Sequence, residues 1–251
     1  MAKPTTREDR RGDGAIQLLF LYLRYAIESQ RERRKEYPME TVTIPSEQRT
    51  VLHNISWETY EHLLADHRDS SSPRFAYDRG ELEIMVVSGR HERPNRLISL
   101  LVEVVAEEMD LDLVNLGSTT FRREDLQRGF EPDSCFYVQN EERIRGRVEI
   151  DPDVDPPPDL VIEVDITSPS LDRFPIYANF GVPEVWRYDG ERIVVYELRD
   201  AEYVEVANSL CMPWFTSEIL TRLVDQGLTM RRRSWTRKVR EWAQSNKETE
   251  G

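Results

Sequence analysis

The chain has 251 residues, of which 39% are hydrophobic and 32% charged, and its formal net charge is −13. This composition is typical of a globular protein with a sizeable core, built as one large domain or two small ones. The negative charge repels phosphate and argues against a protein that coats nucleic acid nonspecifically. The two cysteines, Cys135 and Cys211, exclude a disulfide framework and a zinc-ligand spacing, and they indicate a reducing, cytoplasmic compartment.

Residues 1–37 are predicted to form an N-terminal extension, with a polar start and a helix over residues 15–36. The apolar run in this helix is interrupted by Arg24 and is too short for a membrane span of ~20 residues. We therefore expect no membrane segment. Because apolar side chains spread around much of its circumference, the helix should pack on the main domain or on a second copy of the chain in a homodimer.

Residues 38–230 are predicted to form the main domain, followed by a basic C-terminal helix and tail over residues 231–251. The first elements are a strand, a helix capped by Ser56, a hairpin turning at Gly80, and a long helix over about residues 92–109. The later elements are expected in this order: strands at 111–115, 118–122, 134–138 and 160–166, a short helix at 173–180, a hairpin turning at Asp189-Gly190, and two closing helices. This mixture predicts an α/β or α+β fold with a mixed sheet flanked by helices.

The stretch "PPPDLVIEVDITSPS" combines a buried-strand pattern with carboxylates. Side chains on a strand alternate between its faces, which places the apolar residues from Leu160 onward on one face and Asp159, Glu163 and Asp165 on the other. An edge strand facing water would explain this pattern, and so would a catalytic sheet face.

Residues 149–165 hold seven acids and no basic residue, so this region could bind Mg²⁺ or Mn²⁺, which prefer oxygen ligands. Glu163 and Asp165 lie ~6.6 Å apart along the strand, whereas Asp159 lies ~13 Å from Glu163. Asp159 is therefore better explained as a residue at the start of the strand. A second ligand should come from a neighbouring strand, and Asp133 in "FEPDSCFYV" is the candidate, although Pro-Asp also occurs simply as a turn.

Three segments, "EPDSCFYV", "PPPDLVIEVDITSPS" and "FPIYANFGVPEVWRYD", resemble the signature run of the Uma2 (DUF820) family within the PD-(D/E)XK nuclease superfamily. The resemblance covers roughly residues 45–228. It implies a restriction-endonuclease-like core that cleaves DNA with Mg²⁺ or Mn²⁺ as cofactor. Asp133 matches the motif aspartate and Glu163 the acidic residue of the (D/E)XK element, which makes both the implied metal ligands. His91 matches the first element of the family loosely.

The sequence departs from the motif at its lysine, which is Asp165 here. In many members of the family a basic residue stands instead in the following helix, four positions before a tyrosine. Arg173 occupies that position relative to Tyr177. Arginine can stabilise charge that develops on a phosphate, but it cannot act as a general base. Asp165 would then be an auxiliary ligand or would orient water.

Simpler explanations remain open for several of these residues. His91 could be an exposed residue at a helix start, Arg173 a partner in a surface ion pair, Tyr177 a packing residue, and Glu83 part of a solvated strand face. The stretch 231–240 holds six basic residues around a tryptophan. It could be a solvated helix face or a surface that follows phosphates.

Two functions are therefore predicted from the sequence. The first is a divalent-metal-dependent endonuclease that hydrolyses phosphodiester bonds in DNA. The second is a catalytically inactive protein that uses the nuclease fold to bind a nucleic acid or a protein partner, and the aspartate at position 165 favours it.

Overall fold

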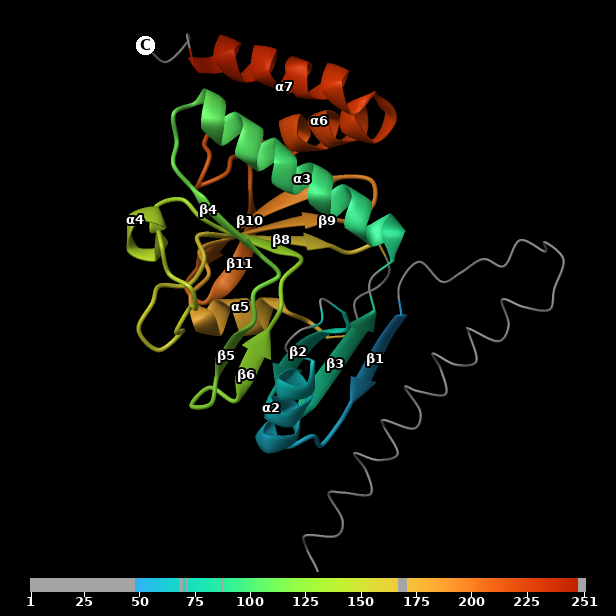
Figure 1. The fold of residues 1–251 in the computed structure, drawn as a ribbon, viewed down its shortest axis with the longest axis vertical. Helices are drawn as coiled ribbons and strands as arrows, with labels where there is room; N and C mark the ends of the chain where they lie inside the picture. Colours follow the sequence, from blue (N-terminus) through green and yellow to red (C-terminus); the bar gives the residue numbers. More distant parts are fainter. Residues whose placement is uncertain (1–47, 68–69, 71, 87, 167–170, 248–251) are drawn as a thin grey trace, which may run out of the picture. The chain divides into compact units, whose positions relative to one another are not determined.

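A computed structural model describes residues 48–67, 70, 72–86, 88–166 and 171–247. The helix predicted over residues 15–36 lies outside the described residues. In the described chain, two β-sheets are flanked by helices (Figure 1). The predicted α+β fold class with a mixed sheet is therefore confirmed. No helix among the described residues is long and apolar enough to cross a membrane.

The first sheet has five antiparallel strands in the order β1-β3-β2-β6-β5. Its strands are β1 (Gln48–Leu52), β2 (Arg74–Asp78), β3 (Glu81–Val86), β5 (Phe121–Arg123) and β6 (Arg128–Phe130). The predicted hairpin is confirmed as β2–β3. Helix α2 (Trp57–Asp66) begins as expected, because the Ser56 hydroxyl accepts a hydrogen bond from the Thr59 amide at 3.2 Å. The short strand β6 has no counterpart among the predicted elements.

The second sheet has six strands in the order β11-β10-β9-β8-β7-β4. Strands β8 and β9 are parallel, and the other neighbouring pairs are antiparallel. Its strands are β4 (Val114–Gly117), β7 (Ser134–Tyr137), β8 (Leu160–Val164), β9 (Glu184–Tyr188), β10 (Ile193–Arg199) and β11 (Glu202–Val206). Because β8 lies between β7 and β9, the explanation of its carboxylates as those of a water-facing edge strand is wrong.

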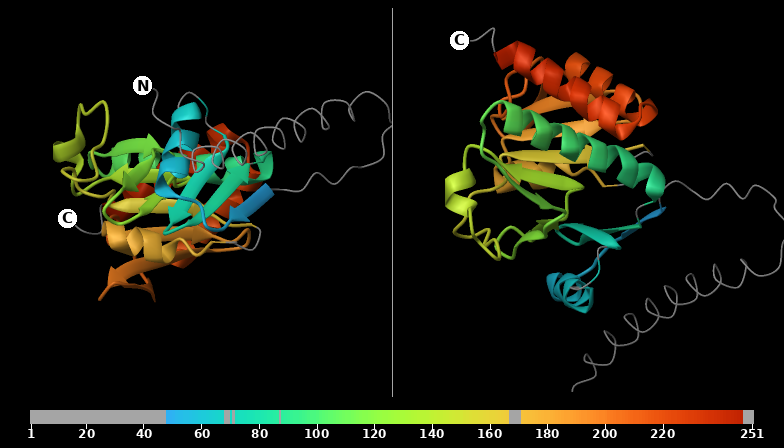
Figure 2. Two further views of the ribbon diagram at one scale, coloured as in Figure 1. Left: turned by 90° about the horizontal axis from the view of Figure 1, so that it is seen from below. Right: turned by 45° about the horizontal axis from the view of Figure 1, so that its top comes forward.

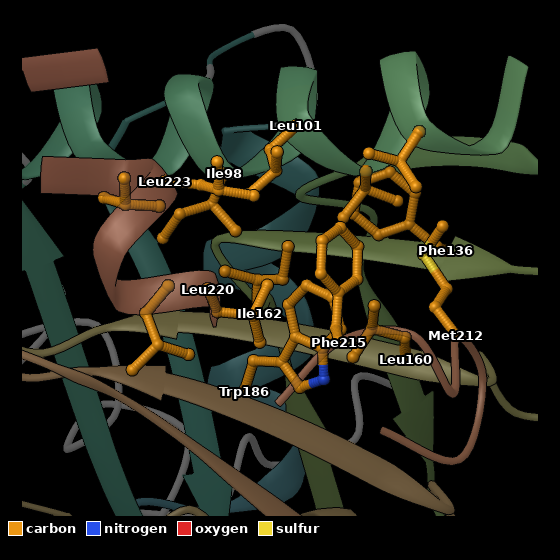
Figure 3. Packing of buried hydrophobic residues seen from close by; sticks show 14 of the residues in the cluster. Ile98, Leu101, Phe136, Leu160, Ile162, Trp186, Met212, Phe215, Leu220 and Leu223 are labelled. Carbon is orange, nitrogen blue, oxygen red and sulfur yellow. The ribbon is translucent and has the colours of Figure 1, made fainter. Parts of the chain in front are cut away.

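Three helices, α3 (Gly89–Glu108), α6 (Ser217–Thr229) and α7 (Arg232–Lys247), lie together on one face of the six-stranded sheet (Figures 1 and 2). Beneath them is the larger hydrophobic cluster, in which Ile98 of α3 meets Ile162 of β8 and Leu220 of α6 (Figure 3). Helix α3 begins three residues earlier than predicted, after Ser88. Burial of side chains from all three helices makes α7 part of the same core.

The opposite face of this sheet packs on a smaller cluster beside α5 (Phe174–Phe180), which holds Val161 of β8 together with aromatic residues of the first sheet and α5. Alternate residues of β8 therefore enter different clusters, as strand geometry requires. Each cluster holds one free cysteine, Cys211 in the larger and Cys135 in the smaller.

Helix α5 ends at Gly181, whose φ of 77° suits glycine. The single-turn helix α4 (Glu141–Ile144) lies in the connection between β7 and β8.

Candidate active site

Asp133 lies where the chain crosses from one sheet to the other, between the end of β6 at Phe130 and the start of β7 at Ser134. Strands β7 and β8 are antiparallel neighbours with Ser134 opposite Ile162. The same register, continued by one residue, places Asp133 opposite Glu163. The prediction that the strands at 134–138 and 160–166 are neighbours in one sheet is therefore confirmed.

The Asp133 carboxylate is fully buried and has three partners. Its Oδ2 accepts a hydrogen bond from the Val164 amide at 2.7 Å and lies 3.0 Å from Nε2 of His91, and its Oδ1 accepts from Arg74. Burial alone would raise the pKa of this carboxyl. The contact with His91, the charge of Arg74 and the Val164 amide outweigh burial and lower the pKa of Asp133. The residue is therefore an anion held in place by Arg74, His91 and the Val164 amide.

Glu163 is buried in the neighbouring strand and has two partners from the helical segment that follows. Arg173 Nη1 lies 3.2 Å from Oε2 of Glu163, and the Tyr177 hydroxyl donates to Oε1. Burial and the nearby negative charge of Asp133 raise the pKa of Glu163 despite the Arg173 charge. Burial and the Glu163 charge likewise raise the pKa of Tyr177. Tyr177 therefore keeps its proton and remains a hydrogen-bond donor to Glu163.

Glu83 of β3 is a further buried member of this site. Its Oε1 accepts a hydrogen bond from Arg173 Nη2 at 2.7 Å and lies 3.7 Å from Nη1 of Arg49, and its Oε2 accepts from the Leu171 amide at 3.3 Å. The expectation of a solvated strand face is wrong for Glu83, which is fully buried. The middle of β3 is buried on both faces. The alternation of polar and apolar residues along this strand therefore could not show whether Glu83 is buried or exposed.

Asp165 follows β8 and contacts two further arginines. Its Oδ1 lies 3.6 Å from Arg49 Nη2, and its Oδ2 accepts a hydrogen bond from Arg187 of β9. Although the motif lysine is missing at this position, guanidinium groups from other strands supply positive charge beside it. Arg49 and Arg187 were not singled out in the sequence, because their proximity to Asp165 arises only from the pairing of distant strands.

These contacts form one network at the junction of the two sheets, which we call the junction cluster. It consists of Glu83, Asp133, Glu163 and Asp165 with Arg49, Arg74, Arg173, Arg187, His91 and Tyr177.

The structure brings together all five residues singled out for the site: His91, Asp133, Glu163, Asp165 and Arg173. Two of the simpler explanations are wrong, since His91 and Arg173 are buried rather than on the surface. Each of the two contacts a carboxylate that the fold also buries, Asp133 for His91 and Glu163 for Arg173.

Asp159 lies outside the junction cluster. Its carboxylate accepts hydrogen bonds from the Val138 amide at 2.7 Å and from the amide and side chain of Asn140. This residue stabilises the turn beyond β7, in agreement with its explanation as a residue at the start of β8.

The donor chemistry of the junction cluster fits a hard divalent cation, because Asp133 and Glu163 offer carboxylate oxygens. Glu163 also lines a pocket of about 430 Å³ together with Asp165 and Arg173. The carboxylates of the cluster nevertheless already contact guanidinium groups, and the described residues contain no group of three or more acidic, histidine or cysteine side chains spaced to hold a metal ion. An ion bound by Asp133 and Glu163 would therefore have to take the place of these cations.

Comparison with known proteins identifies the family of the chain. A crystal structure described as that of a "putative nuclease belonging to DUF820 from Anabaena variabilis ATCC 29413" aligns with 68% of this chain and 99% of its own, at 16% identity and a TM-score of 0.43. No match was found among curated proteins. The model of the Uma2 family, described as "Putative restriction endonuclease", matches residues 57–221. This match runs from α2 into α6 and includes every strand of the two β-sheets except β1, and the chain belongs to the Uma2 family.

Proposed function

We propose that the protein is a divalent-metal-dependent endonuclease that hydrolyses phosphodiester bonds in DNA. Membership of a family described as "Putative restriction endonuclease" supports a nuclease. The observation that carries the proposal is the meeting of Asp133 and Glu163 on adjacent strands, with the buried Arg173 guanidinium 3.2 Å from Glu163. Paired carboxylates next to a fixed positive charge suit phosphoryl chemistry, in which negative charge must be bound and stabilised.

Each residue of the site has a role in this proposal. Asp133 and Glu163 would hold Mg²⁺ or Mn²⁺, which supplies a Lewis acid and lowers the pKa of water. Arg173 keeps its charge at every relevant pH and stabilises negative charge on the phosphate in the transition state. Tyr177 orients Glu163 through its hydrogen bond, and His91 does the same for Asp133.

Asp165 is assigned a positioning role. Because it contacts Arg49 and Arg187, its charge holds both guanidinium groups beside the pocket that Glu163 lines. These arginines supply, from strands β1 and β9, positive charge near the position of the missing motif lysine.

The test replaces Glu163→Gln in the full chain. A neutral amide is a much poorer ligand for a hard cation, so both Mn²⁺ binding, measured by titration calorimetry, and cleavage of plasmid DNA should be lost. Glu81→Gln is the matched control, since Glu81 is an exposed glutamate two residues from Glu83, and it should retain both properties. Cleavage by Glu163→Gln at the wild-type rate would refute the assigned role of Glu163.

A second function is favoured by one specific observation. All four carboxylates of the junction cluster contact arginine side chains, so the cluster could serve as a structural network in a non-catalytic protein that binds nucleic acid or a protein partner. A wild-type protein that binds neither Mg²⁺ nor Mn²⁺ in the same titration, and cuts no DNA with either ion, would establish this alternative over the endonuclease.

A further inference from the structure

The start of α7 carries a group of exposed basic side chains, which we call the α7 basic face: Arg231, Arg232, Arg233, Arg237 and Lys238. Of these, Arg237 lies 3.7 Å from Glu241 of the same helix. Within the described part of the chain, the other four residues have no carboxylate at ion-pair distance. The group lies beyond residues 57–221, which the family model matches.

The α7 basic face belongs to a rigid scaffold. Trp235, Val239 and Ala243 of α7 are completely buried, and the Trp235 indole donates a hydrogen bond to the Leu223 carbonyl at 2.8 Å. Midway along α7, Arg240 pairs with two glutamates at the end of α3. Since α7 uses these apolar side chains in the core, it has no continuous exposed apolar side to insert into a membrane.

A groove of about 570 Å³ connects this face to the junction cluster. Arg232 of α7, Arg96 of α3 and Arg74 of β2 are among the residues that line it, and Asp133 lines it as well with its side chain buried. Two acids, Glu92 and Glu103, also line the groove, but Glu92 pairs with both Arg74 and Arg96. The groove therefore places basic side chains of α7, α3 and β2 beside a proposed metal ligand.

We propose that the α7 basic face, together with Arg96, binds the phosphate backbone of double-stranded DNA beside the groove that Asp133 lines. The placement of the duplex next to Asp133 rests on the proposed function. Duplex DNA carries one negative charge per ~1.7 Å of its axis, and the α7 basic face supplies the complementary charge on a protein whose net charge is −13. Contacts of this kind position a duplex without reading its sequence.

The test measures binding of a fluorescent DNA duplex by anisotropy, in EDTA so that no cleavage occurs, over a series of salt concentrations. In the triple variant Arg231→Ala/Arg232→Ala/Arg233→Ala, the Kd should rise about tenfold or more. The slope of log Kd against log salt should fall by about 1 for each phosphate that the variant no longer neutralises. The matched control is Arg143→Ala/Arg192→Ala/Arg199→Ala, which removes three exposed arginines outside α3 and α7 and should leave the Kd unchanged. Thermal unfolding checks that both variants are folded.

Three results would overturn the proposal. They are equal weakening in both triple variants, unchanged binding in the α7 variant, and binding of anionic lipid vesicles in place of DNA by the wild-type protein. Failure of the proposed endonuclease function is distinguished by a separate result. If the wild-type protein binds DNA through α7 in EDTA but cuts none with Mg²⁺ or Mn²⁺, the proposed DNA-binding surface stands and the proposed endonuclease activity is refuted.

Discussion

The junction cluster and the α7 basic face arrange charge in opposite ways. In the cluster, carboxylates and guanidinium groups are buried and hold one another. On α7, guanidinium groups point into water and four of the five basic residues have no acidic partner in the described chain. A buried charge without a partner is costly, whereas an exposed charge is screened by salt and free to meet a ligand. The net charge of −13 therefore predicts neither the paired, buried charges of the junction cluster nor the exposed positive charges of the α7 basic face.

The largest expected effect is on stability and separates the two regions directly. Arg74→Ala leaves the buried Asp133 carboxylate without its arginine and should lower the free energy of unfolding by about 3–5 kcal/mol. Arg231→Ala, on the α7 basic face, should change it by less than about 0.5 kcal/mol. Urea unfolding measures both values. A loss in Arg74→Ala as small as that in Arg231→Ala would mean that water already reaches Asp133.

The next effect concerns the rate of DNA cleavage. Arg173→Ala should slow cleavage by ~10²–10³, the usual cost of losing one group that stabilises transition-state charge. Mn²⁺ binding should not weaken, because the ion would otherwise have to displace this guanidinium from Glu163. Arg173→Lys keeps the positive charge and should recover part of the rate. The exposed Arg192→Ala is the control. Rates are compared on protein shown by urea unfolding to be folded. Cleavage unaffected in Arg173→Ala would leave the arginine with a structural role alone.

A third effect tests the position of the missing motif lysine. Asp165→Lys restores the residue usual in the superfamily, but the new charge would face Arg49 and Arg187. We expect a loss of roughly 1–3 kcal/mol in the free energy of unfolding, which Asp165→Asn should show to a smaller extent because it adds no like charge. An Asp165→Lys protein as stable as the wild type, with faster cleavage, would contradict the positioning role given to Asp165.

The smallest effect is a pH dependence of stability. Because the pKa of Asp133 is lowered on folding from the ordinary value of 3.8, its ionised form stabilises the fold above that pH. This contribution is lost as the pH falls through the lower folded pKa. The stability difference between wild type and Asp133→Asn should therefore shrink in urea titrations carried out at pH values below the ordinary pKa. If the stability difference between wild type and Asp133→Asn does not change with pH, the charge of Asp133 does not stabilise the fold.

The sequence predicted the local elements of the fold well, because their signals are local. The Ser56 cap, the hairpin at Gly80 and the alternation in β8 each depend on a few consecutive residues. The pairing of Asp133 with Glu163 was also predictable, since both stand in or beside strands that carry the motif.

The ion pairs that join the other members of the junction cluster were not predictable from such local signals. Glu83 and Arg173 are separated by 90 residues, and Arg49 contacts Asp165 from a different sheet. His91 looked exposed because it stands in a polar helix start, yet it is buried against Asp133. Which charges meet depends on how the two sheets join, and no periodicity within a single strand or helix encodes that junction.

The two cysteines report separately on the two faces of the six-stranded sheet. Cys211 lies in the cluster beneath the three helices and Cys135 in the cluster beside α5. Burial raises the pKa of Cys135 to about 12 and raises that of Cys211 as well, so neither thiol should react while its side of the sheet is closed. Alkylation followed by peptide mass mapping would then reveal which face opens first, with no label introduced into the chain.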